Sequence, residues 1–139
     1  MKLRRKRLPP ELESSFEAFN AVLAEVEPAK AVLTEVMPTT RLPGRPLPDA
    51  LLEFEERIGR ALRAMPDWRR PETEEVWQRC TDGLAEALVR AHWLREEAPE
   101  LGGFEGLIWT VEHLMAPLDP FEAGAERYRA MRRASHRLV

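Results

Sequence analysis

The sequence predicts an all-α protein, a four- or five-helix bundle, and three observations lead to this fold class. Apolar residues recur at spacings of three and four along most of the chain, which is the spacing of one buried helix face. β-branched residues do not alternate with polar ones for long, so no segment favours a strand. Prolines and a Gly-Gly pair separate the helical stretches, and amphipathic segments joined by mostly short links favour a bundle.

The length of 139 residues fits one domain, and a hydrophobic content of 44% is enough to form its core. We expect residues 1–8 to form a flexible basic arm and residues 9–139 to form a single helical-bundle domain. No internal repeat divides the chain.

The first helix is expected to begin at Pro9-Pro10, because proline suits the first turn of a helix. Pro28 has no N–H to offer the carbonyl of Ala24, so this helix is expected to be kinked or broken there. Residues 38–48 hold four prolines and one glycine, which predicts a long proline-rich crossover to the second helix. Whether the first two helices run parallel or antiparallel is left open by this crossover.

Prolines also mark the later helices. A second helix is expected from Asp49 to Met65, a third from Pro71, and a fifth from Pro120. Between Gly102-Gly103 and Pro117 lies a fourth helix, whose apolar side is expected to be formed by Phe104, Leu107, Ile108, Val111, Leu114 and Met115.

Charge is segregated along the chain, although the formal net charge is only −3. Residues 1–7 carry +5, and so do residues 127–139. The body between them holds 24 acidic and 11 basic residues, a net charge of −13. An acidic body with two basic ends is the main electrostatic feature of the chain.

The expected location is the cytoplasm. A single cysteine cannot form an intramolecular disulfide, no apolar stretch approaches the roughly 18 residues of a membrane span, and the basic start lacks the apolar segment of a secretory signal. Eighteen arginines against three lysines, with one asparagine and one glutamine, favour a bacterial source with a GC-rich genome and adaptation to heat.

Recognisable catalytic motifs are missing from the sequence, so the chain is expected to be non-enzymatic and to carry no cofactor. There is no phosphate-binding Gly-x-x-x-x-Gly-Lys loop and no Gly-x-Ser-x-Gly elbow. Cys80 lies on the apolar side of the third helix, where a buried thiol has a raised pKa and is a poor nucleophile.

A metal site is an alternative hypothesis. The Glu-x-x-His pairs of di-iron bundles are absent, but His92 and Glu96 on the third helix and Glu112 and His113 on the fourth would converge if these helices are antiparallel neighbours. The simpler interpretation is that both histidines are solvated.

Tryptophans on the outer sides of two helices are the sharpest anomaly. At about 100° per residue, Val89 and Trp93 project opposite the apolar side of the third helix, and Trp109 does the same on the fourth. An indole within an acidic rim resembles the core of a protein interface. The alternative is that the part of the first helix after Pro28 covers these rings.

The basic ends allow another alternative, binding of nucleic acid or an anionic membrane. The residues concerned are Arg4, Arg5, Lys6 and Arg7 in the arm and Arg129, Arg132 and Arg133 in the fifth helix. The acidic body opposes this, and the simpler interpretation is that both ends meet acidic protein surface.

The sequence therefore leaves the function open. The preferred hypothesis is a non-enzymatic helical protein-interaction module, most simply a homodimer. A bundle enzyme or metal-binding protein, and an anion-binding protein, are the two alternatives.

Overall fold

The computed structural model describes residues 8–96 and 103–137. These residues form five α-helices: α1 (Pro10–Thr34), α2 (Leu47–Ala64), α3 (Glu74–Glu96), α4 (Gly103–Met115) and α5 (Pro120–Arg137). Three short 3₁₀ segments lie between them: η1 (Met65–Trp68), η2 (Pro71–Thr73) and η3 (Ala116–Leu118). The described residues contain no strand, and the all-α prediction is confirmed.

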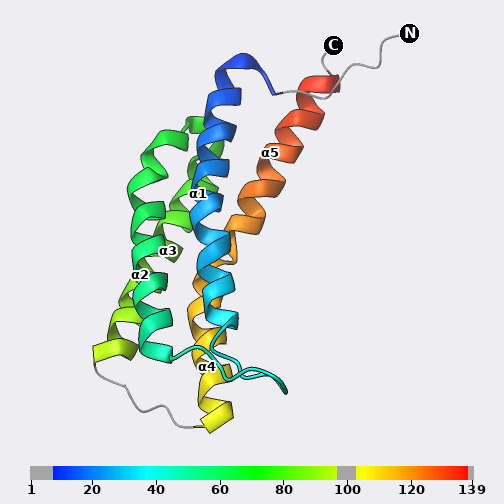
Figure 1. Ribbon diagram of the computed structural model, residues 1–139. Coiled ribbons are helices and arrows are strands. Elements are labelled where there is room, and N and C mark those ends of the chain that lie inside the picture. Colours follow the sequence, from blue (N-terminus) through cyan, green and yellow to red (C-terminus); the bar gives the residue numbers. More distant parts are fainter. Residues whose placement is uncertain (1–7, 97–102, 138–139) are drawn as a thin grey trace.

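The helices pack as an up-and-down bundle with four sides (Figure 1). α1, α2 and α3 alternate in direction, and α4 followed by α5 runs back along the fourth side. We call the stretch from Gly103 to Arg137 the α4–α5 arm; η3 interrupts it, with Pro117 as its second residue. The crossover after α1 spans one end of the bundle, so α1 and α2 are antiparallel. It is shorter than expected, because α2 already begins at Leu47.

Pro28 lies inside α1, which continues to Thr34 without a break. We expected a kink or a break at this proline, and the helix does not break there. Val26 and Ala29 on either side are fully buried, and packing of this kind offsets the loss of one hydrogen bond.

An aromatic cluster fills the upper half of the core. Phe19 packs edge-on against Trp68 with ring centres 4.9 Å apart, and lies 5.1 Å from Tyr128. The indole N–H of Trp77 donates to the carbonyl of Met65 at 2.7 Å, which ties η1 to α3. The aromatic cluster thus joins α1, η1 and α5, and the bond from Trp77 attaches α3 beside it.

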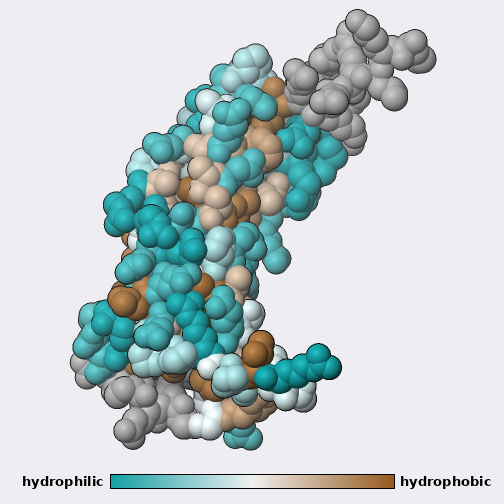
Figure 2. All heavy atoms as spheres, in the orientation of Figure 1, coloured by the Kyte–Doolittle hydropathy of each residue, from teal (hydrophilic) through white to brown (hydrophobic). Residues whose placement is uncertain are grey.

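Leu8, at the boundary expected between arm and domain, is only 5% exposed and belongs to the core. The rest of the predicted arm lies outside the described residues. Figure 2 shows that the side covered by α1 and α2 is mainly hydrophilic. Ion pairs cross it, among them Arg60 with Glu25 at 2.8 Å, and each exposed pair contributes at most about 1 kcal/mol. Within the described part of the chain, no helix has the length and apolar character of a membrane span.

Candidate functional site

The structure leaves both outer indoles about half exposed. Trp93 on α3 is 48% exposed and Trp109 on α4 is 45% exposed, while Val89, one turn before Trp93, is 64% exposed. The part of α1 after Pro28 does not cover them. Val32 in this part of α1 and Val36, two residues after the helix ends, pack instead with Leu107 and Val111 of α4. Large exposed apolar side chains that lie together mark contact surfaces more often than isolated ones do.

Two further apolar residues of α4 are exposed, so the buried side expected for the fourth helix was partly wrong. Phe104 is 57% exposed and Ile108 is 36% exposed. Thr110 and Leu114 are the fully buried residues of α4, so the helix touches the bundle along a narrow stripe. At about 100° per residue, Phe104 and Ile108 lie about 100–140° around α4 from Trp109, on the flank of Leu107 and Val111. We call the set Val89, Trp93 and Trp109 the outer α3–α4 face.

The two helices of this face are joined by Arg90. Its Nη1 donates to the carbonyl of His113 at 2.9 Å, and its Nε donates to Glu86 at 3.0 Å. Trp93 lies one turn after Arg90, and Trp109 one turn before His113. Because α3 and α4 run in opposite directions (Figure 1), both indoles lie at the same level on the outer side of this joint.

The ring of His113 stacks on Trp109, with centroids 4.5 Å apart and planes inclined by 16°. Burial lowers the pKa of His113 below its ordinary value, and the neighbouring guanidinium of Arg90 adds to this effect. The imidazole is therefore neutral at neutral pH, and together with the indole it adds an aromatic, uncharged area to the outer α3–α4 face.

The candidate metal ligands contact different neighbours. Nδ1 of His92 lies 3.7 Å from a carboxylate oxygen of Glu55 on α2, whereas Glu96 accepts from Arg95 at 2.7 Å. Glu112 is exposed on α4, beside His113. Across residues 8–96 and 103–137, no three histidine, cysteine, aspartate or glutamate side chains gather as metal ligands would. The thiol of Cys80 is buried, and burial raises its pKa to about 12.

The arginines of α5 mostly contact groups of the same chain. Arg129 and Arg133 both pair with Glu126, at 2.9 and 2.8 Å. The guanidinium of Arg132 lies over the ring of Phe16 at 4.9 Å, which is cation–π geometry. Arg4, Arg5, Lys6 and Arg7 lie outside the described residues.

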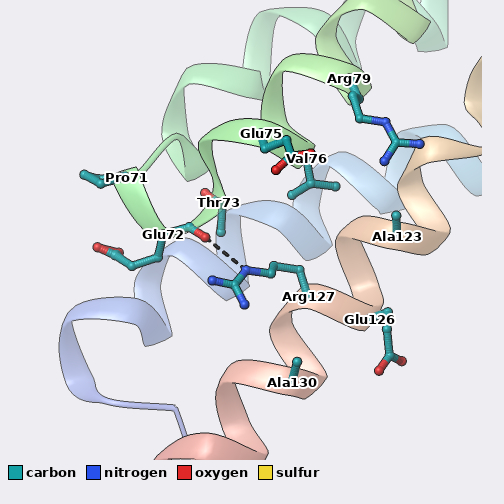
Figure 3. Close-up of a pocket in the computed structure, with 10 residues that line it drawn as sticks. All are labelled: Pro71, Glu72, Thr73, Glu75, Val76, Arg79, Ala123, Glu126, Arg127 and Ala130. Carbon is teal, nitrogen blue, oxygen red and sulfur yellow. Dashed lines mark hydrogen bonds between the residues drawn. The ribbon is translucent and has the colours of Figure 1, made fainter.

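A surface groove between the start of α3 and the middle of α5 was not foreseen from the sequence (Figure 3). Its volume is about 620 Å³, and its apolar lining includes Val76, Ala123 and Ala130. Glu72, Glu75, Arg79, Glu126 and Arg127 supply the charged lining. The Nε of Arg127 crosses it to donate to the carbonyl of Glu72 at 3.1 Å. We call this the α3–α5 groove; its one sequence signal is the small residues at positions 123 and 130.

A second hollow, of about 330 Å³, lies between the groove and the outer α3–α4 face, where α3 passes η3. Gly83 is its central residue: a side chain there would overlap the carbonyl oxygen of Pro117. The absence of a side chain at this position is what lets the α4–α5 arm approach α3 so closely.

These features define an all-α helical-bundle protein with an exposed aromatic face and a separate groove. Comparisons with protein-family models, with curated proteins and with solved structures find no match.

Proposed function

We propose that this protein is a non-enzymatic helical interaction module, and that its outer α3–α4 face binds a second copy of the chain in a homodimer. One observation carries the proposal: two indoles and Val89 are each at least 45% exposed on two adjacent helices. Tryptophan is enriched among the residues that dominate binding energy at interfaces. A twofold dimer is the most common way for a soluble protein to bury such a surface.

The absence of catalytic motifs from the sequence is consistent with this proposal. Neither alternative gains a comparable observation from the described residues. His92 and Glu96 contact Glu55 and Arg95, and the α5 arginines contact Glu126, Phe16 and Glu72.

Sedimentation equilibrium over a wide range of protein concentration tests the proposal. The expected species has twice the 16.0 kDa mass of the chain. Trp93→Ser and Trp109→Ser should each weaken the dimer by about tenfold or more, since truncating a central interface anchor costs about 2 kcal/mol or more. Leu52→Ser is the matched control, because Leu52 is also 48% exposed but lies on α2.

Acrylamide quenching of tryptophan fluorescence supplies an independent measurement. Trp68 and Trp77 are buried within the chain, so only Trp93 and Trp109 should become protected as the concentration rises. A chain that sediments as a monomer at every concentration, with unchanging quenching, would overturn the proposed function.

A further inference from the structure

Gly83 of α3 lies directly against the backbone of Pro117, where α3 meets the α4–α5 arm, and we take this contact as the midpoint of the surface between them. The outer α3–α4 face lies on one side of this midpoint and the α3–α5 groove on the other. An exposed apolar projection and an apolar-floored groove thus occupy the two halves of the same side of the bundle.

The spacing of the two halves is nearly symmetrical. On α3 and the residues before it, Trp93 comes ten residues after Gly83, and Thr73, which lines the groove, comes ten residues before it. Along the α4–α5 arm, Trp109 comes eight residues before Pro117, and Glu126 and Arg127 come nine and ten residues after it. At about 1.5 Å per helical residue, each half extends roughly 12–15 Å from the midpoint.

The α4–α5 arm also changes charge along its length, between Glu126 and Arg127. Residues 103–126 contain five acidic residues and no lysine or arginine, whereas residues 127–137 contain five arginines and no acidic residue. Two identical arms placed side by side in opposite directions about Pro117 would set residues 103–107 of one copy, which include Glu105, against residues 127–131 of the other, which include Arg127 and Arg129. Parallel arms would set like charges together, which is costly at an interface.

From the spacing and the charges together, we infer that two copies pair with antiparallel α4–α5 arms, so that each copy places Trp93 and Trp109 in the α3–α5 groove of the other. The twofold axis passes near Gly83 and Pro117. This inference rests on the proposed function, because it requires the outer α3–α4 face to bind a second copy. The inference adds to the proposed function the surface of the second copy that this face contacts, which is the α3–α5 groove.

The groove suits the side chains that it would receive. Its volume of about 620 Å³ is within the ~300–1,000 Å³ range of sites that enclose small organic molecules. Val76, Ala123 and Ala130 offer apolar contact, and Arg79 and Arg127 from opposite walls (Figure 3) can lie over an indole in cation–π contact. Each dimer would contain two such contacts, as an isologous interface requires.

A charge-reversal pair tests the antiparallel arrangement. With the axis near Pro117 and Leu118, Glu105 of one copy lies opposite the region of Arg129 of the other. Glu105→Arg alone and Arg129→Glu alone should each weaken the dimer by about tenfold, through two like-charge contacts. An equimolar mixture of the two variants should restore wild-type dimerisation, because both contacts then join opposite charges. Glu56→Arg, on the exposed side of α2, is the control for charge reversal alone.

Filling the groove tests the second surface without touching the indoles. Ala130→Trp should occupy the groove within its own chain and reduce dimerisation by at least about tenfold, as loss of a central contact does. Ala21→Trp places the same side chain on an exposed position of α1 and should leave dimerisation unchanged. Circular dichroism and thermal unfolding of each variant distinguish loss of the dimer from loss of the fold.

The outcomes separate the two proposals. If the tryptophan variants abolish dimerisation while the charge mixture and Ala130→Trp have no selective effect, the antiparallel arrangement is wrong and the proposed function stands. If a folded Ala130→Trp variant and the single charge reversals weaken the dimer and the mixture restores it, the arrangement is supported. A wild-type chain that is always monomeric overturns both.

Discussion

The hydroxyl groups of Ser15 and Tyr128 lie 2.6 Å apart in the core, and they join the first helix of the bundle to the last. The Ser15 hydroxyl also donates to the carbonyl of Trp68 at 3.2 Å. Since serine has one hydroxyl proton, the Tyr128 hydroxyl is the donor in the bond between the two side chains. Three sides of the bundle therefore share one buried polar contact.

Because Tyr128 donates to Ser15, removing one hydroxyl or the other should change the free energy of unfolding by different amounts. Ser15→Ala leaves the buried Tyr128 hydroxyl without its partner and should lower the free energy of unfolding by about 1–3 kcal/mol. Tyr128→Phe leaves Ser15 bonded to Trp68 and should cost only about 0.5–1.5 kcal/mol. Urea denaturation of both variants measures the difference, and a larger loss for Tyr128→Phe would reverse the assigned direction.

Alkaline pH should destabilise the protein through Tyr128. Burial raises the pKa of its hydroxyl above the ordinary value, and the hydrogen bond with Ser15 only partly opposes this. The folded chain thus holds the phenolic proton more tightly than the unfolded chain. The resulting stability is complete below about pH 10 and is lost as the pH rises through the folded-state pKa. Tyr128 is the only tyrosine, so the ultraviolet absorbance of tyrosinate measures its titration directly. If the folded and unfolded chains had the same midpoint pH in this titration, the prediction would be wrong.

Two glycines in helix interiors should respond in opposite ways to replacement by alanine. At Gly59, on α2, a β-carbon would meet only the end of Arg63 at 3.6 Å, so Gly59→Ala should stabilise by roughly 0.5–1 kcal/mol. At Gly83, the β-carbon would overlap the backbone of Pro117, so Gly83→Ala should destabilise by about 1–3 kcal/mol. Thermal unfolding of the two variants checks the signs, and stabilisation by Gly83→Ala would show that the contact with η3 yields readily.

The orientation of α4 can be measured with two truncations on the same helix. Leu114 is fully buried and Ile108 is 36% exposed. Leu114→Ala should lower the free energy of unfolding by about 2–5 kcal/mol, as large-to-small core substitutions do. Ile108→Ala should cost less than about 1 kcal/mol in the monomer, because little burial is lost. Denaturation at low protein concentration gives both values, and equal costs would mean that α4 is rotated from the described position.

The starts of three helical segments were predictable because proline marks them. Pro10, Pro71 and Pro120 each begin a helical segment, since a fixed φ and a missing N–H are tolerated in the first turn. The buried positions of Trp77 and Cys80 also followed from their spacing on α3. These are local properties of the chain, so they can be predicted from the type and spacing of its residues.

The sides of α4 were harder to assign, because apolar residues occur on almost every side of this helix. Phe104 and Ile108 fit the predicted stripe as well as Leu114 does, and only the path of the neighbouring helices decides which are covered. The α3–α5 groove depends likewise on the separation of two helices far apart in sequence. A kink or a break was expected at Pro28; the helix does not break, because the burial of Val26 and Ala29 is a tertiary effect that the sequence does not contain.

The first turn of α1 and the last turn of α5 lie at the same end of the bundle, whereas the connection from α1 to α2 lies at the opposite end (Figure 1). The order of the helices along the chain is therefore separable from their packing. A circular permutant, with its original termini joined by a short linker and new ones opened near Leu42, would retain every helix-to-helix contact. In such a permutant α1 would directly follow α5, and the surface that carries the indoles would be untouched.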